Sequence, residues 1–428
     1  MPIPTAYMKY LSTLLSCTLV AANAALGMDI ATDITPGEDT KTTEWVQSIV
    51  VGQPALQSEI KGDTTISFKA PEMDIASAFC WQQPESTRGS EDGHDTVIAR
   101  NLSVSEGKTV SFVFPADEYP HGPLCIRILA VNQLGQMDRF ELQLYNQGGV
   151  RWREGIPEAD PEPAAGMRLV FEDDFDGPLS ISKEGRGTLY TSHKPFGGDF
   201  GEWLFGDVES PDNPFAQQHT YLRIRTHKKE GDPGYCGLIS AARPNATGVF
   251  VRAPFYMECR FVALAAPGTW PAFWTLSQNS LTLRSKDPDA RVDQDELDII
   301  EAYGGLGEGN PNHPGYTITT HWWFQKDADG EKIKPVHRRL PMMEIGDGSY
   351  WSTTFHTYGV KVTKSLTTYY MDSIPVFEHP TGPVSQTDGH FFMINYAIGG
   401  PWPVDLERYA NSCDMWVDYV RVYESDRP

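Results

Sequence analysis

The chain of 428 residues has few basic residues, few cysteines and no long apolar run. Its 57 acidic residues outnumber 35 basic ones, and the resulting net charge of -22 would repel phosphate backbones and anionic membranes. Nucleic acid is therefore not expected as a partner. No segment approaches the roughly 20 consecutive apolar residues that a transmembrane helix needs. Helical periodicity of useful length is also missing, which excludes barrels of alternating strands and helices.

The six cysteines show no C-x2-C spacing, so they match no zinc pattern. Removal of a leader would leave five, and an odd number leaves at least one unpaired. Strand alternation places Cys125, beside Arg127, on the face opposite to its apolar neighbours, and it turns Cys80 away from the core as well. A disulfide between Cys80 and Cys125 along one sheet stays open, whereas a bridge through the core is disfavoured.

The first residues have the form of a secretory signal. Met8-Lys9 precedes an apolar stretch, and Ala22-Asn23-Ala24 resembles a cleavage site. We expect residues 1–24 to be a signal peptide and the mature protein to be secreted, either extracellular or periplasmic. A lipid anchor at Cys17 is the alternative, but the apolar run before it is very short.

Two β-domains, a small one followed by a large one, are expected along the rest of the chain. Residues 46–150 contain short runs of alternating polarity that predict an immunoglobulin-like or fibronectin-like sandwich, with a hairpin turn at Asn132–Gly135. The proline-rich, acidic residues 151–166 predict a linker. Residues 167–425 again contain strands without intervening helices, which predicts one large antiparallel sandwich.

The segment from Asp293 to Tyr303 places acids at positions 296, 298 and 301 among β-branched residues. On a helix, Glu296 and Glu301 would lie about 140° apart. On a regular strand, Glu296 and Asp298 share one face and Glu301 lies on the other. One extra residue at Ile299–Ile300, a β-bulge, would return Glu301 to the face of its partners.

Such crowding suits retaining glycoside hydrolysis, in which one carboxylate attacks the anomeric carbon and a protonated partner donates to the leaving oxygen. A third carboxylate between them would raise the pKa of its neighbours. A solvated acidic strand is the plainer interpretation, and a metal site made of these acids and His321 is the other alternative. The chain has no His-Glu-x-x-His and no Gly-x-Ser-x-Gly motif. The glycines from Gly304 to Gly309 predict a loop bordering a cleft.

The segment resembles the catalytic motif of glycoside hydrolase family 16 in its laminarinase-like form, and further blocks match in the same order. These blocks are Leu169–Gly177, Trp270–Trp274, Phe355–Gly359, Tyr370–Asp372, Ile394–Trp402 and Val417–Tyr423. The resemblance runs through residues 167 to 425 and implies a β-jelly roll of two curved sheets.

The resemblance also implies roles for single residues. Glu296 would be the nucleophile, Asp298 its assistant and Glu301 the acid/base. The resemblance further suggests His321 as a cleft histidine and Trp270 and Trp274 as sugar-binding residues, although a core position for either tryptophan is equally consistent with the sequence.

The chain departs from the family just before the motif. Laminarinase-like members commonly carry a Trp-Pro pair and a glycine there, whereas this chain has Ala290–Asp295. The polymer therefore stays open among β-1,3-glucan, β-1,3/1,4-glucan, galactans and exopolysaccharides. We expect a monomeric, endo-acting, retaining β-glycanase, with a transglycosylase or a non-catalytic carbohydrate-binding protein as alternatives.

The chemistry of the motif requires no cofactor. The resemblance implies a possible structural calcium ion, for which Asp418 is the matching carboxylate. The small domain is expected either to bind carbohydrate or to act as a spacer.

Overall fold

The structure is a computed structural model that describes residues 44–82, 96–151, 154–231, 233–284, 291–305, 315–342, 350–400 and 402–425. The signal peptide predicted at residues 1–24 lies outside the described residues, as do positions 306–309 of the glycine-rich loop. Within the described part of the chain, no helix has the length and apolar character needed to cross a membrane.

The N-terminal part of the described chain, as far as Asn146, folds into two small sheets, ordered β1-β3-β6 and β2-β8-β7-β4-β5. The strands are β1 (Val50–Gln53), β2 (Glu59–Ile60), β3 (Asp63–Lys69), β4 (Ile75–Phe79), β5 (Val97–Ser103), β6 (Val110–Pro115), β7 (Gly122–Val131) and β8 (Met137–Asn146). Strands β7 and β8 form the predicted hairpin: Gly135 takes a positive φ of 82°, and its amide donates to the Asn132 carbonyl at 3.0 Å.

Alternation along β7 sends Ile126, Ile128 and Ala130 into the core, as the sequence predicts. The prediction for Cys80 was wrong. Cys80 belongs to the same core cluster, and its thiol lies 3.3 Å from the side-chain oxygen of Gln82. Cys125 is a buried free thiol, so the two residues are not joined by a disulfide.

The larger unit follows from residue 168, and its described residues contain eighteen strands. The first nine are β9 (Arg168–Asp173), β10 (Ile181–Ser182), β11 (Tyr190–Thr191), β12 (Leu204–Phe205), β13 (Phe215–Gln218), β14 (Tyr221–His227), β15 (Tyr235–Ser240), β16 (Val251–Arg252) and β17 (Phe255–Ala263). The others are β18 (Thr269–Ser277), β19 (Gln294–Ala302), β20 (Gly315–Trp323), β21 (Val336–Pro341), β22 (His356–Val362), β23 (Leu366–Met371), β24 (Ile374–Pro380), β25 (Gly389–Ile398) and β26 (Ser412–Glu424).

Helices are short in the described residues. The α-helix α2 spans Asn279–Arg284, and single 3-10 turns are η2 (Ser105–Gly107), η3 (Ala116–Glu118), η4 (Glu162–Ala164) and η5 (Glu407–Tyr409).

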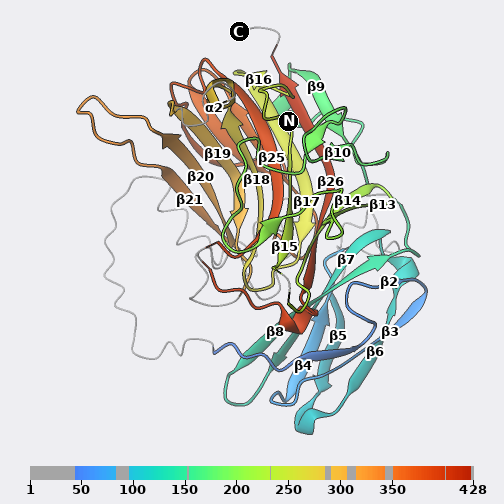
Figure 1. Cartoon of the computed structure of the whole chain (residues 1–428). Coiled ribbons are helices and arrows are strands. Elements are labelled where there is room, and N and C mark those ends of the chain that lie inside the picture. Colours follow the sequence, from blue (N-terminus) through green and yellow to red (C-terminus); the bar gives the residue numbers. More distant parts are fainter. Residues whose placement is uncertain are drawn as a thin grey trace, which may run out of the picture.

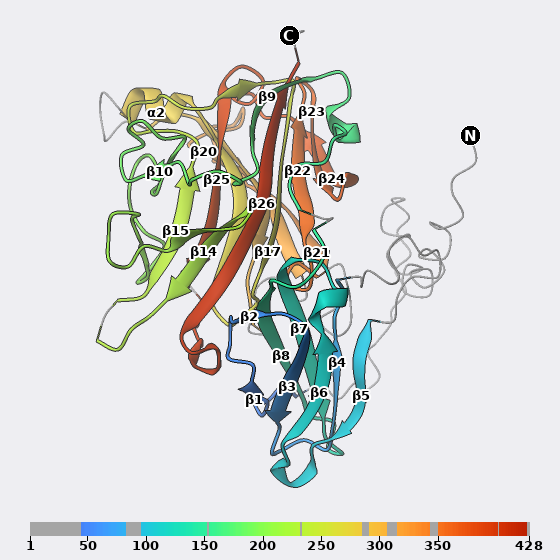
Figure 2. The same cartoon turned by 90° about the vertical axis from the view of Figure 1, so that its right-hand side faces the viewer.

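The eighteen strands form two layers that are linked at β15 (Figures 1 and 2). In one layer β14 and β9 flank β26, which is followed by β17, β22, β23 and β24. In the other, β15 and β16 flank β25, followed by β18, β19, β20 and β21. Buried side chains such as Phe273 and Met257 fill the core. The predicted fold class, all-β with a large sandwich after a smaller one, is confirmed.

The two units pack against each other through the outer face of β7 and β8, as Figure 1 shows below the large sandwich. Arg127 pairs with Glu141 at 2.6 Å, and Ser352 of the large unit donates to the same carboxylate at 2.6 Å. The Gln143 side chain donates to the Asp414 carbonyl at 2.9 Å and accepts from the Asp414 amide at 3.2 Å. The face that the sequence assigns to Cys125 and Arg127 is therefore buried by the second domain.

The proline-rich segment at residues 151–166 also packs against the large unit. Its Gly155 amide donates to Asp418, and the Tyr423 hydroxyl donates to Asp160. Ala164 is buried with Tyr256 and Tyr423. The described part of this segment is thus attached along β26, which limits the freedom that a linker composition suggests.

Candidate active site

Strand β19 carries the three acids, and its register changes between them. Glu296 pairs with His321 and Asp298 with Thr319 on β20, whereas Glu301 pairs with Thr317. Three steps along β19 correspond to two steps along β20, so β19 contains one extra residue. The shift falls at Ile299–Ile300, where the sequence places a bulge, and it puts Glu301 on the face of the other two acids.

The opposite face of β19 explains why the extra residue is held there. Leu297, Ile299 and Ile300 are each at most 1% exposed and belong to the hydrophobic core. Two consecutive isoleucines anchored in the core leave the carboxylates on the outer side of the strand. The core thus positions the acids, because slipping the register would move isoleucine into solvent and glutamate into the core.

Burial makes the carboxylates hard to ionise together. The pKa of Glu296 is raised to about 8, first by burial and then by the charge of Glu301. Burial raises the pKa of Glu301 to about 7, against the effect of a hydrogen bond from Trp270. The pKa of Asp298 lies well above its usual range because of burial and both glutamates. The cluster therefore retains protons at neutral pH, which supplies a proton donor beside an ionised carboxylate.

His321 faces the acids from β20. Its Nε2 lies 3.6 Å from Asp298 Oδ2 and 3.9 Å from Glu296 Oε1, and its ring stacks on Trp323 at 4.7 Å. Burial, followed by the charges of His337 and Lys332, lowers the pKa of His321 to about 4. The imidazole is therefore neutral at pH 7.

A metal ion is a chemical alternative for part of this cluster. Glu296, Asp298 and His321 each offer one ligand atom, and these atoms lie within 4.8 Å of one another. Among the described residues, this is the group of three such side chains that could hold an ion.

The two predicted tryptophans have different positions. Trp270 donates from Nε1 to Glu301 Oε1 at 3.2 Å, and its ring stacks with Tyr303 at 4.9 Å and with Phe200 at 5.0 Å. Trp274 is only 6% exposed and donates to Asn395 at 2.9 Å. Trp270 therefore contacts Glu301 directly, whereas Trp274, which pairs with Asp298 in the register of β18 and β19, is bonded to Asn395 on β25.

Sequence reasoning missed Lys194, which the loop between β11 and β12 brings to the acids. Its side chain is buried, and its ammonium lies 4.1 Å from the centre of the Phe200 ring. Burial lowers the pKa of Lys194, while the charges of Asp199 and Glu296 raise it. The ammonium in turn lowers the pKa of Glu296. A single lysine among aromatic residues gives no sequence signal beyond its apolar neighbourhood.

Asp418 lies apart from this cluster, on β26 in the other layer. It is fully buried, forms an ion pair with Arg260 and accepts the Gly155 amide at 2.8 Å. Among the described residues, it belongs to no group of three potential metal ligands. The contacts of Asp418 are those of a structural ion pair that holds the attached segment in place.

Comparison with known proteins gives partial matches. No protein-family model matches the chain. Endo-1,3-1,4-beta-glycanase ExsH of Rhizobium meliloti (strain 1021) is 25% identical over 177 residues, and Endo-1,3-1,4-beta-glycanase EglC of the same organism is 27% identical over 177 residues. Each match covers 41% of this chain and 32% of the relative. The clotting factor G alpha subunit of Tachypleus tridentatus is 25% identical over 174 residues, covering 39% of this chain and 22% of that protein.

Solved structures give matches to the larger part of the chain. The catalytic domain of an endo-1,3-beta-glucanase (laminarinase) from Thermotoga petrophila RKU-1 matches 61% of this chain and 99% of its own, with 18% identity and a TM-score of 0.43. The endo-beta-1,3-glucanase from Pyrococcus furiosus matches 63% of this chain and 98% of its own, with 20% identity and a TM-score of 0.45. The chain is thus similar to glycanases over part of its length, and it spans about a third of the first two relatives.

Proposed function

We propose that the chain is a secreted, endo-acting β-glycanase that hydrolyses its polysaccharide with retention of configuration. The observation that carries the proposal is the presence of Glu296, Asp298 and Glu301 on one face of β19, in surroundings that keep them partly protonated. A solvated acidic strand would have ordinary pKa values, because nothing would oppose ionisation.

The proposed mechanism has two displacements. Glu296 attacks the anomeric carbon, the bond to the leaving oxygen breaks, and Glu301 gives that oxygen its proton. Glu301, now ionised, then removes a proton from water, whose oxygen displaces Glu296 from the sugar. Asp298 lies beside both glutamates and shares the cluster's protons, and the neutral His321 offers a hydrogen bond from the next strand.

The pKa values of the two glutamates in the absence of substrate do not show which is the nucleophile and which is the acid/base. The pKa of Glu296 is about 8 and that of Glu301 about 7, so the nucleophile is not the more acidic of the two. The roles are taken from the resemblance in the motif. Lys194 and a hydrogen bond from Trp323 favour the ionised form of Glu296, which is the form that attack requires.

The substrate proposed first is a β-1,3-1,4-linked glucan. Two partial relatives are named endo-1,3-1,4-beta-glycanases, and the exposed edge of the acid cluster is lined by aromatic residues that suit sugar rings.

We propose that the chemistry needs no metal. A chelator should therefore leave hydrolysis unchanged, whereas loss of activity that added divalent metal restores would support an ion at Glu296, Asp298 and His321.

Two variants test the catalytic roles. Glu301→Gln should lower the hydrolysis of mixed-linkage glucan by a factor on the order of 10²–10⁴, because protonation of the leaving oxygen is lost. The same variant should still release dinitrophenol rapidly from an activated aryl β-glycoside, whose leaving group needs no proton. Glu296→Gln should lose both reactions, because attack itself is lost.

The matched control is Glu202→Gln, an exposed glutamate in the described loop before β12. The proposal would be contradicted if Glu296→Gln hydrolysed the polymer as fast as the wild type. If Glu296→Gln released dinitrophenol and Glu301→Gln did not, the roles of the two glutamates would be exchanged.

Proton NMR of the first product should show the β-anomer. Products longer than the starting oligosaccharide would instead identify a transglycosylase, and binding without any product would identify a carbohydrate-binding protein.

A further inference from the structure

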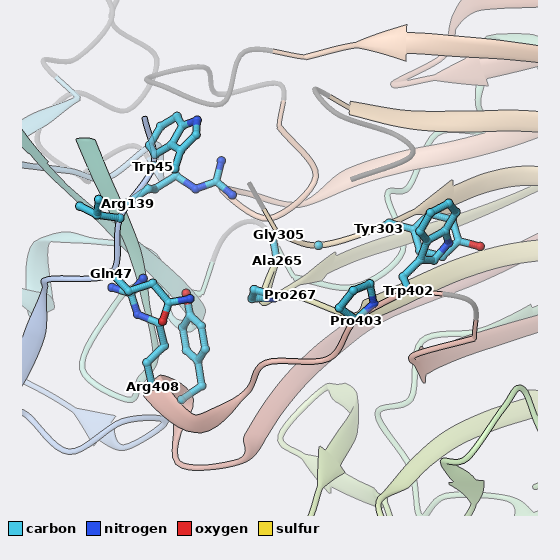
Figure 3. Close-up of a pocket in the computed structure, with 14 residues that line it drawn as sticks. Trp45, Gln47, Arg139, Ala265, Pro267, Tyr303, Gly305, Trp402, Pro403 and Arg408 are labelled. Atoms are coloured by element: carbon cyan, nitrogen blue, oxygen red, sulfur yellow. The ribbon is translucent and has the colours of Figure 1, made fainter. Parts of the chain in front are cut away.

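A cavity of about 280 Å³ lies where the small domain meets the large one (Figure 3). Trp45, Gln47 and Arg139 line it from the small domain. Residues of three segments of the large domain complete its lining: Ala265, Pro267 and Gly268; Tyr303, Gly304 and Gly305; and Trp402, Pro403, Arg408 and Tyr409. The cavity is therefore shared between domains that the sequence would treat as separate functional units.

Aromatic contacts connect this cavity to the catalytic acids. Tyr303 follows Glu301 by two residues, directly after the end of β19 at Ala302, and two residues of extended chain span about 7 Å. Its ring stacks with Trp270, which donates to Glu301, and meets the Trp402 ring edge to face at 5.8 Å. Burial, and after it the charge of Glu301, raises the pKa of Tyr303. A ligand held at Glu301 therefore has Tyr303 and Trp402 as its next neighbours.

The charges in the cavity wall are already matched. Arg408 binds Asp138 through two hydrogen bonds, at 3.0 and 2.9 Å, and Arg139 lies 3.8 Å from Glu141. An anionic ligand would have to compete with these buried carboxylates, at a cost in desolvation. The remaining lining includes the rings of Trp45, Tyr303 and Trp402, two prolines and the backbone of three glycines. Aromatic rings beside peptide groups are the combination that recognises neutral sugar rings through stacking and hydrogen bonds.

The floor of the cavity is backbone held in close contact. A Cβ on Gly304 would come within 2.1 Å of both the Ala266 carbonyl oxygen and the Thr269 hydroxyl. A side chain at position 304 would therefore prevent the end of β19 from packing against the segment that connects β17 to β18. This contact holds Tyr303 between the acids and the small domain.

We propose that this cavity is a glycan-binding subsite, in which Trp45 of the small domain binds a neutral sugar unit of the polymer cleaved at Glu296 and Glu301. The proposal rests on the proposed function for the identity of the polymer. It gives the small domain a part in the substrate site itself, instead of a separate binding surface or a spacer. Short substrates that span only the acids do not reach Trp45, whereas longer ones do.

The test measures binding as a function of ligand length. The full chain carrying Glu296→Gln, which prevents turnover, is titrated calorimetrically with mixed-linkage β-1,3-1,4-gluco-oligosaccharides from disaccharide to octasaccharide. Adding Trp45→Ala should weaken binding of the longest members about tenfold, as expected for loss of one stacked ring, and leave the shortest binding member unchanged. Trp45→Phe should restore most of the affinity, and Leu134→Ala, at a 79% exposed site in the same domain, is the control.

A second variant fills the cavity without removing a packed side chain. Gln47 is exposed, and its side chain makes one exposed hydrogen bond, to Asp405 at 2.9 Å. Because loss of that bond costs little, Gln47→Trp should fold normally and exclude long oligosaccharides while short ones bind as before. Unchanged affinities in both variants, an equal loss at all lengths, or no binding of the octasaccharide by the parent would overturn the inference. Hydrolysis by the wild type is measured separately. Cleavage without dependence on Trp45 would reject this subsite alone, and Trp45-dependent binding without cleavage would reject the proposed catalysis alone.

Discussion

At the scale of single residues, Glu296 and Glu301 differ in the groups that contact them. Glu301 accepts a hydrogen bond from Trp270, whereas Glu296 faces His321 and lies within the field of Lys194. These neighbours act on carboxylates that burial has already made difficult to ionise. Catalysis by such a pair requires one protonated and one ionised carboxyl, so rate should be highest where the pair holds one proton. With pKa values of about 7 and about 8, that state is most populated between those pH values.

Lys194→Met should move the pH profile of kcat/KM to higher pH. The ammonium stabilises the ionised form of Glu296, so its removal raises the pKa of that carboxyl. On the acidic side of the optimum, kcat/KM should fall by a factor on the order of three, which corresponds to a shift of about half a pH unit. Initial rates on mixed-linkage glucan across the pH range measure this.

Lys194→Arg, which keeps the charge, should leave the profile close to that of the wild type. Lys183→Met removes another lysine, one whose side chain is 58% exposed and paired with Asp207, and should have no effect. A profile that stays in place in Lys194→Met would show that the ammonium does not influence the reacting carboxyls.

At the scale of the element, β19 depends on one extra residue. In a regular strand, positions that differ by an even number share a face, and Glu296 and Glu301 differ by an odd number. The bulge at Ile299–Ile300 corrects this parity while both isoleucines stay in the core. The strand thus meets two demands, core packing on one side and a shared carboxylate face on the other.

Deleting Ile299 and inserting an alanine after Ile300 should have opposite consequences for activity. Deletion removes the bulge but leaves an even spacing, so the acids stay on one face and hydrolysis should remain detectable. It should also cost about 2–5 kcal/mol of stability, because a buried isoleucine is lost. The insertion adds a second extra residue between Glu296 and Glu301, which turns Glu301 to the opposite face of the strand. Activity should therefore fall by a factor on the order of 10²–10⁴. Circular dichroism confirms that each variant is folded before rates are compared. An active insertion variant beside an inactive, folded deletion variant would refute this account of β19.

At the scale of the whole molecule, the two domains share a polar, buried interface. Strands β7 and β8 are buried on both faces, one by the small core and one by the large domain. The Glu141 carboxylate accepts hydrogen bonds from Arg127 and Ser352. Complete burial raises the pKa of Glu141, but the charges of Arg127 and Arg139 together with these hydrogen bonds lower it below its usual value. Such an interface is specific because each buried charge has its partner only when the domains are docked.

Arg127→Ala should destabilise the full chain by about 3–5 kcal/mol, since Glu141 would be left buried without its closest partner. Replacing both residues, as in Arg127→Met with Glu141→Leu, should recover most of that loss, because no unpaired charge remains. Chemical denaturation monitored by tryptophan fluorescence measures the free energy of unfolding.

Lys108→Ala is the control. It removes a surface ion pair whose side chains are 64% and 80% exposed, and it should cause no measurable change in the free energy of unfolding. A loss no larger than that of the control would show that the interface does not depend on this pair.

The sequence by itself determined which residues share a face within the regular strands, although not at Cys80, which lies beyond the end of β4 at Phe79. Strand alternation predicted the core positions Ile126, Ile128 and Ala130, and the spacing of the acids required an extra residue in β19. These are local properties, because successive side chains in a strand point to opposite sides whatever lies beyond them. The all-β class followed from the same periodicity.

Only the tertiary structure decided what each face contacts. Alternation separated Cys125 and Arg127 from the core of the small domain but could not reveal that a second domain covers them, since Ser352 is 225 residues away along the chain. For the same reason, the sequence could not show that the charge of Lys194 acts on Glu296 or that Trp45 lines a cavity together with Tyr303. Contacts of this kind depend on how distant segments pack, and no period in the local sequence records that packing.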